Sequence, residues 1–167
     1  MIQVYTGNGK GKTTAAFGLA LRASGAGLNV YIGQFTKGRC CGEHKALKMI
    51  KNIKLEQYGR ACFIRTKPTQ ADIESARQGW EKVKKIAAGG SYQVIILDEI
   101  NIALKFKLLP LKEVLDFISL IPKNVELVLT GRDAPAQLIQ AADLVSQIKE
   151  VKHCYRQGVK ARKGIEL

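Results

Sequence analysis

The chain has 167 residues, of which 46% are hydrophobic and 25% are charged, a balance typical of a globular domain rather than a disordered chain. Its length predicts a single domain over residues 1–167. No apolar run approaches the roughly 18 residues that a membrane-spanning helix requires. Residues 1–7 lack the basic start and the cleavage pattern of a secretion signal. We therefore expect a cytoplasmic protein without a membrane partner.

Positive charge is concentrated in two stretches of the chain. Lys and Arg number 27 against 14 Asp and Glu, and residues 37–67 and 149–167 carry +7 and +4 of the net charge of +13. Such clusters attract polyanions such as ATP, phosphorylated ligands or nucleic acid, although a solvated basic surface is an equally open interpretation. Because these charges are not interleaved with stacking aromatic residues, we expect no nucleic-acid partner.

The four cysteines are Cys40, Cys41, Cys62 and Cys154. They form no CxxC motif, and the adjacent pair does not have the spacing of zinc ligands. A chain of this length also builds its core without disulfide bonds. We interpret the cysteines as free thiols in a reducing compartment.

Short apolar runs alternate with longer segments of helical periodicity along the whole chain. In chain order, the pattern predicts a strand over residues 2–5, a helix over 13–26, a strand over 29–35, a basic helix over 43–51, a short strand over 53–58, a long amphipathic helix over 69–88, a strand over 93–98, a helix over 110–120, a strand over 125–130, a helix over 134–141 and a last strand over 144–151. This alternation predicts an α/β fold with a mostly parallel sheet flanked by helices. Ligands of such sheets bind at the carboxyl ends of the strands.

The first strand leads into a glycine-rich segment and then a helix, which is the context of a phosphate-binding loop. The expected ATP-binding residues are Gly7, Asn8, Gly9, Lys10, Gly11, Lys12, Thr13 and Thr14. Glycines let backbone N–H groups turn toward an anion, and the helix N-terminus adds unpaired donors. Lys12 supplies a charge for phosphate oxygens, and the Thr13 hydroxyl is a ligand for Mg²⁺. The loop is one residue shorter than the G-x-x-x-x-G-K-[ST] pattern.

A carboxylate pair follows the apolar strand predicted over residues 93–98. Asp98 and Glu99 there are typical of a Walker B motif, in which a carboxylate completes the ligand shell of Mg²⁺ or Mn²⁺. The open alternative is an acidic strand end that caps the next helix.

Lys37 and Arg132 follow two other predicted strands. At the carboxyl ends of a sheet they are candidates to contact a ligand, and the alternative is that they are ordinary loop charges. The two histidines, His44 and His153, are isolated in the sequence and form no catalytic triad. We interpret His153 as structural.

Together these segments resemble the P-loop type of ATP:corrinoid adenosyltransferase, the cob(I)alamin adenosyltransferase family. The matching segments are residues 5–18, 34–38, 97–99, 109–111, 130–132, 151–153, 158–161 and 164–165. Members of this family share the shortened loop. The resemblance implies a RecA-like P-loop nucleotide-binding fold.

The resemblance also implies an activity. A reduced Co(I) corrinoid would attack the 5′ carbon of ATP, the 5′-deoxyadenosyl group would move to cobalt and triphosphate would leave, in the biosynthesis or salvage of adenosylcobalamin. The implied catalytic residues are Lys12, Thr13 and Glu99, with Asp98 as a further metal ligand and Arg132 on ATP. The implied partners are a flavoprotein reductant and a second copy of the chain.

The chain departs from the family pattern after the third predicted strand. Familiar members carry a Gly-Phe-Thr-Trp segment there, whereas residues 59–64 read Gly-Arg-Ala-Cys-Phe-Ile. Phe63 is our candidate for the apolar wall that displaces the lower axial ligand of cobalt. Cys62 and Lys37 are further candidates on the corrinoid side.

Two other classes of function stay open. A RecA-like ATPase acting on nucleic acid would use the basic segments as a phosphate track and would hydrolyse ATP in response to DNA or RNA. A nucleotide-binding regulator would consume no ATP with any reduced corrinoid.

Overall fold

The computed structural model describes residues 1–60, 64 and 67–165. Its elements are β1 (Ile2–Thr6), α1 (Lys12–Gly25), β2 (Val30–Phe35), α2 (Gly42–Leu47), β3 (Ile53–Tyr58), α3 (Gln70–Ala88), β4 (Val94–Asp98), α4 (Ile100–Lys105), α5 (Leu111–Leu120), β5 (Glu126–Thr130), α6 (Ala136–Ala141), β6 (Leu144–Gln147) and the 3₁₀ helix η1 (Cys154–Gln157). The strands form one six-stranded sheet in the order β3-β2-β4-β5-β1-β6, and every pairing is parallel. The predicted α/β class is confirmed.

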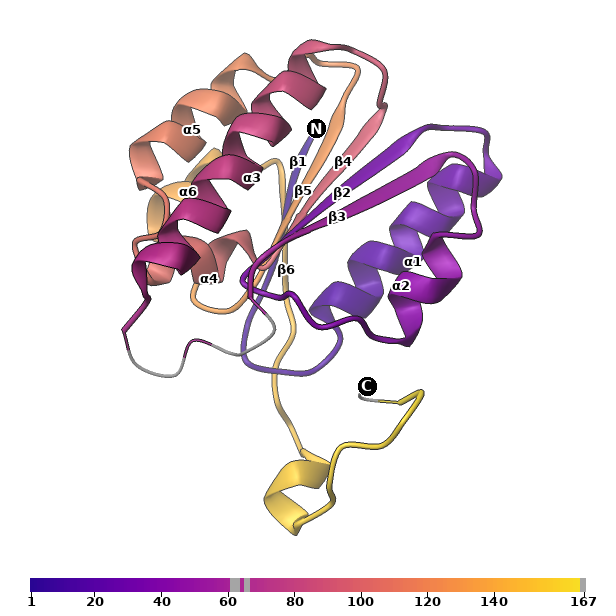
Figure 1. Cartoon of the computed structure of the whole chain (residues 1–167), viewed down its shortest axis with the longest axis vertical. Helices are drawn as coiled ribbons and strands as arrows, with labels where there is room; N and C mark the ends of the chain where they lie inside the picture. The colour runs from indigo at the N-terminus through magenta and orange to yellow at the C-terminus, as the bar shows by residue number, and fades with distance from the viewer. Residues whose placement is uncertain (61–63, 65–66, 166–167) are drawn as a thin grey trace.

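Helices cover both faces of this sheet (Figure 1). Helices α1 and α2 lie on one face, and α3, α5 and α6 lie on the other. Each face has its own apolar cluster, because successive side chains of a strand point to opposite faces. In β4, Ile95 and Leu97 pack on the α3 and α5 side, whereas Val94 and Ile96 pack beneath α1. Asp98 continues the second of these rows and so faces the start of α1.

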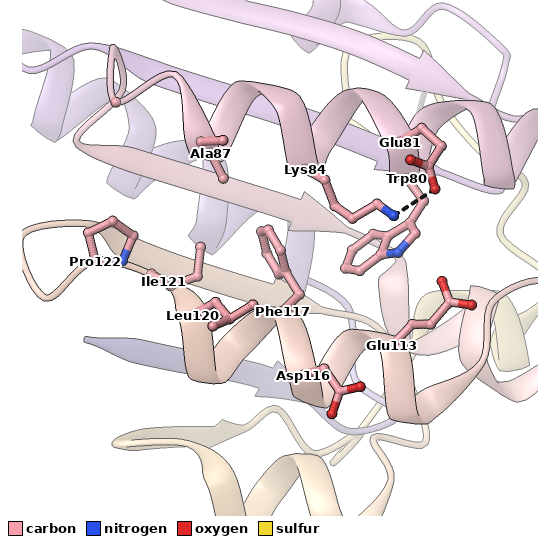
Figure 2. Close-up of a pocket in the computed structure, with 12 residues that line it drawn as sticks. Trp80, Glu81, Lys84, Ala87, Glu113, Asp116, Phe117, Leu120, Ile121 and Pro122 are labelled. Carbon is pink, nitrogen blue, oxygen red and sulfur yellow. Dashed lines mark ion pairs between the residues drawn. The ribbon is translucent and has the colours of Figure 1, made fainter.

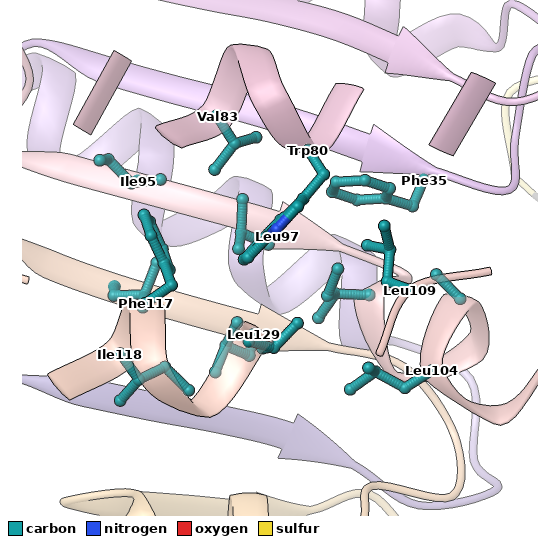
Figure 3. Close-up of a cluster of buried hydrophobic side chains, with 14 of the residues drawn as sticks. Phe35, Trp80, Val83, Ile95, Leu97, Leu104, Leu109, Phe117, Ile118 and Leu129 are labelled. Carbon is teal, nitrogen blue, oxygen red and sulfur yellow. The ribbon is translucent and has the colours of Figure 1, made fainter. Parts of the chain in front are cut away.

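The larger cluster fills the space between the sheet and the α3–α5 layer. Figure 3 shows Trp80 of α3 and Phe117 of α5 meeting over Leu97 of β4. The two rings meet edge to face with their centroids 5.0 Å apart, an arrangement that aromatic pairs favour. This packing buries Leu97, the residue directly before Asp98, in the core.

The residues Thr69-Gln-Ala-Asp72 resemble a capping box in the sequence, with Asp in place of Glu, and the long helix α3 begins there. The Thr69 side chain accepts a hydrogen bond from the backbone N–H of Asp72, and Asp72 accepts one from the backbone N–H of Thr69. The backbone N–H groups at the start of a helix have no carbonyl partner within it, and this exchange satisfies two of them.

Four elements differ by more than two residues from the sequence prediction. Helix α2 ends at Leu47 rather than at residue 51, because the chain tightens into turns to bring Ile53 beside Val30. Strand β6 ends at Gln147 rather than at residue 151, because its partner β1 ends at Thr6, where the chain turns into the glycine-rich loop. Helix α4 and η1 were not predicted, since both are shorter than the window in which periodicity is recognisable.

None of the helices in the described part of the chain has both the length and the apolar character needed to cross a bilayer.

Candidate functional site

The glycine-rich segment after β1 forms a tight loop that is supported by the chain following β6. The Gly9 N–H donates to the Ile148 carbonyl at 2.8 Å, and the Ile148 N–H donates to the Thr6 carbonyl at 2.8 Å. Gly7 has a φ of 98°, in the region that favours glycine. A Cβ at Gly7 would lie 2.4 Å from the Ile148 carbonyl oxygen. The loop therefore requires glycine both for its backbone angle and for the close approach of Ile148.

Lys12 is the first residue of α1, and its ammonium group lies inside the loop. Lys12 Nζ donates to the carbonyl oxygens of Gly7 at 2.7 Å and of Gly9 at 2.8 Å. Burial is the largest influence on its pKa, which is lowered, while the nearby Glu99 opposes that effect. A cation that is partly desolvated and held in a ring of backbone groups is well placed to bind phosphate oxygens.

Asp98 is fully buried and receives hydrogen bonds from three side chains. Thr13 and Thr130 donate their hydroxyls to Oδ1 at 2.9 and 2.6 Å, and Gln34 Nε2 donates to Oδ2 at 2.7 Å. These donors come from α1, β5 and β2, so the carboxylate joins three elements of the fold. Three such donors satisfy the oxygens of a carboxylate that is withdrawn from water.

Glu99 follows Asp98 in a left-handed conformation, with a φ of 59°. Such an angle is costly for a residue other than glycine and is common at functional sites. The pKa of Glu99 is raised to about 7, first by burial and then by the neighbouring charge of Asp98. Glu99 stands at the N-cap position of α4, but its side chain makes no capping hydrogen bond. The capping alternative therefore does not account for this carboxylate.

The oxygens of Thr13, Asp98 and Glu99 form a donor set that suits Mg²⁺ or Mn²⁺. A hard divalent cation prefers hydroxyl and carboxylate oxygens. The pKa of Glu99 is raised because its side chain is withdrawn from water and because the charge of Asp98 repels a second negative charge. A cation bound there would relieve that repulsion, so the residues present fit the ion.

The remaining predicted residues lie around this centre. Asn8, Lys10 and Thr14 are exposed on the loop and the first turn of α1, and Lys10 Nζ donates to the Ile165 carbonyl at 3.3 Å. Arg132 is exposed after β5. Its positive charge lowers the pKa of both Lys12 and Glu99.

Lys37 follows β2 and forms an ion pair with Glu43 at 3.2 Å. Of the corrinoid-side candidates, Phe63 and Cys62 lie outside the described residues. The other three cysteines carry free thiols.

The family is evident from comparison with known proteins. The family model described as ATP:corrinoid adenosyltransferase BtuR/CobO/CobP matches residues 1–167. The chain is 36% identical over 169 residues to the corrinoid adenosyltransferase of Pseudomonas aeruginosa, covering all of this chain and 83% of that protein. It is 35% identical over 166 residues to the corrinoid adenosyltransferases of Escherichia coli K12 and Salmonella typhimurium, covering 99% of this chain and 85% of each relative. The chain belongs to the ATP:corrinoid adenosyltransferase family.

Sequence reasoning missed two residues of this adenosyltransferase site. Gln34 had been noted only as part of a motif, yet it is fully buried and hydrogen-bonded to Asp98. His44 is not isolated, as the sequence suggested, because its Nε2 lies 2.8 Å from Gln34 Oε1. The signal available in the sequence was a polar glutamine within an otherwise apolar strand, directly before its last residue. His153 is structural as predicted, since its side chain caps η1 by accepting from the Tyr155 N–H.

A second concavity lies between α3 and α5, away from the nucleotide loop (Figure 2). This groove has a volume of about 610 Å³ and is lined by Trp80, Phe117 and Leu120, among others. It extends toward Gly90 and Pro122, which precede β4 and β5. The groove therefore opens toward the amino ends of the strands, opposite to the edge that carries Lys12 and Asp98.

Replacing Gly7 by alanine is expected to weaken ATP binding by about tenfold or more. The positive φ alone costs an alanine roughly 1–2 kcal/mol, and the new Cβ would press on the Ile148 carbonyl. Isothermal titration with ATP measures the loss. Gly25→Ala is the matched control, because Gly25 ends α1 with open space around it. Equal affinities of the two variants would contradict the requirement for glycine in the loop.

Proposed function

We propose that the chain, acting as a single domain over residues 1–167, transfers the 5′-deoxyadenosyl group of ATP to the cobalt of a reduced Co(I) corrinoid and releases triphosphate. The observation that carries this proposal is the Lys12 ammonium, which lies within a shortened phosphate loop beside Asp98 and Glu99. In the reaction, cobalt supplies an electron pair to the 5′ carbon. The bond between that carbon and the triphosphate oxygen breaks, and triphosphate takes the electrons of that bond.

The reacting carbon belongs to the ribose, so the loop holds the leaving group. Lys12 and the backbone N–H groups of the loop would stabilise the negative charge that grows on the departing oxygen. The positive end of the α1 dipole lies at the helix N-terminus beside the loop and would stabilise the same negative charge. Cobalt is itself the nucleophile, so the protein needs no general base. Its contribution is to align the 5′ carbon with cobalt and to exclude water.

Thr13, Asp98 and Glu99 are proposed to hold Mg²⁺ or Mn²⁺ with ATP. When bound, the cation neutralises charge on the triphosphate. Asp98 receives the Thr13 hydroxyl and is itself oriented by Gln34 and Thr130. Glu99, with its raised pKa, would release its proton when the cation binds. Arg132 is proposed to contact the nucleotide from the β5 side.

The corrinoid is proposed to bind near the segment that follows β3. Phe63 would supply an apolar wall against the lower face of the corrin ring, with Cys62 beside it. Lys37 lies after β2 and is proposed to contact the corrinoid from that side. We further propose that a flavoprotein supplies the electrons, that the chain forms a homodimer and that it is located in the cytoplasm. Free thiols at Cys40, Cys41 and Cys154 agree with a reducing compartment.

The decisive experiment is the identity of the phosphate product. The enzyme is incubated with ATP, Mg²⁺ and chemically reduced cobalamin, and the corrin spectrum and the released phosphates are followed together. We expect adenosylcobalamin and triphosphate in equal amounts. ADP and phosphate released in response to DNA or RNA would instead identify a RecA-like ATPase.

A further inference from the structure

His44 connects helix α2 to the metal-binding carboxylate through a buried chain of hydrogen bonds. Its side chain is 1% exposed. Its Nδ1 accepts the backbone N–H of Cys41 at 2.8 Å, and its Nε2 lies 2.8 Å from Gln34 Oε1. Gln34 Nε2 in turn donates to Asp98 Oδ2 at 2.7 Å. Four residues from three elements thus form a continuous path.

The direction of every hydrogen bond in this path follows from one backbone group. The Cys41 N–H is always a donor, so Nδ1 of His44 must be unprotonated. Neutral histidine then carries its proton on Nε2 and donates it to Gln34 Oε1. The amide of Gln34 is thereby oriented with its NH₂ group toward Asp98. In the flipped orientation, the amide oxygen of Gln34 would face the carboxylate and repel it.

The surroundings of His44 favour the neutral form that this path requires. Burial is the largest cause of its lowered pKa, and Lys37 acts in the same direction. Glu43 and Asp98 oppose the effect, but Glu43 is paired with Lys37. Neutral His44 can donate from Nε2 while it accepts at Nδ1.

Gln57 of β3 gives the same amide partial support. Its Nε2 donates to Gln34 Oε1 at 2.9 Å, but it also donates to the Lys37 and Arg39 carbonyls, each at 3.3 Å. One NH₂ group shared among three acceptors is a weaker constraint than the dedicated bond from His44.

We propose that His44 is a positioning residue for adenosyl transfer, which orients Gln34 so that Asp98 presents its free lone pairs to Thr13 and to the divalent cation. The inference rests on the proposed function, and it assigns His44 no contact with ATP or corrinoid. Removal of the Nε2 donor is therefore expected to affect cation binding more than the binding of ATP without a cation.

His44 also has a local role, because it accepts the backbone N–H of Cys41 at the start of α2. Two substitutions separate the positioning of Gln34 from this local role. In His44→Asn, the amide oxygen lies near the former Nδ1 and still accepts from Cys41, but the side chain does not reach Gln34. In His44→Gln, the longer amide lies near the former Nε2 and donates to Gln34. We expect His44→Asn to weaken Mn²⁺ binding in the presence of ATP by about tenfold, since a hydrogen bond supporting a charged group is lost. His44→Gln is expected to remain within about threefold of the wild type on the same grounds.

The test measures free Mn²⁺ by electron paramagnetic resonance in the presence of ATP, the dissociation constant of ATP in EDTA, and the split between kcat and KM for the metal. Gln34→Met removes the donor to Asp98 and is expected to reproduce the loss. His44→Asn added to Gln34→Met is expected to cause no further loss. Equal losses in His44→Asn and His44→Gln, or a further loss in the double variant, would overturn the proposal. Mn²⁺ binding needs no turnover, so it stays informative even if the chain transfers no adenosyl group.

Discussion

Lys12→Ala is expected to lower kcat/KM for adenosyl transfer by at least about 10³-fold. Loss of a single preorganised neutral donor at a developing oxyanion costs roughly 10²–10³-fold, and Lys12 contributes a full positive charge. Its Nζ already lies within hydrogen-bonding distance of two loop carbonyls. We therefore expect this ammonium group to be preorganised at the site where the triphosphate gains charge.

The measurement is steady-state turnover with chemically reduced cobalamin, together with thermal unfolding of each variant. Lys12→Met keeps most of the apolar stem and is expected to lose activity to the same extent. Lys123→Ala controls for net charge, because Lys123 is exposed before β5 at the opposite edge of the sheet. Near-normal turnover in a folded Lys12→Ala variant would refute the assignment of the phosphate loop.

Glu99→Gln is expected to make the metal-free protein more stable above pH 7 while it impairs metal-dependent turnover. The pKa of Glu99 is raised in the folded chain from 4.5 to about 7. Between these values the folded state holds a proton that the unfolded state has released, so the free energy of unfolding falls as pH rises through that window. A rise of this size corresponds to roughly 3 kcal/mol. Glutamine carries no charge and removes that cost.

Urea unfolding in EDTA at pH 4 and pH 8 tests this expectation. The variant is expected to gain as much as roughly 3 kcal/mol at pH 8 and to show little gain at pH 4, where Glu99 is mostly protonated in both states. Glu113→Gln, on the exposed face of α5, is the control and is expected to change little. With Mg²⁺ present, turnover of Glu99→Gln is expected to need more metal. An unchanged Mg²⁺ requirement would indicate that Asp98, rather than Glu99, holds the cation.

The phosphate loop, the acidic pair and the cap of α3 were recognisable in the sequence. Each of these features depends on residues close together in the chain. Gly7 to Gly11 form a loop whose conformation their own glycines permit, and Thr69 reaches Asp72 across a single helical turn. Asp98 and Glu99 directly follow an apolar run that identifies a central strand. Local geometry makes such signals readable.

The arrangement around Asp98 at the carboxyl end of the sheet depends on a strand register that no local signal specifies. Gln34 meets Asp98 because β2 pairs with β4 in a register that places these two residues side by side. That register results from the packing of entire strands against helices on both faces. The length of β6 similarly depends on where its partner β1 ends.

The sequence by itself determined the α/β class, the nucleotide loop and the acidic strand end, because short-range backbone preferences and hydrophobic periodicity encode them. Tertiary structure alone decided the partners of Asp98, the burial of His44 and the close approach of Ile148 to Gly7. These contacts join residues from 10 to 141 positions apart. Such contacts form only when whole elements pack, since burial and hydrogen bonding then compensate for the conformational entropy lost on bringing distant residues together.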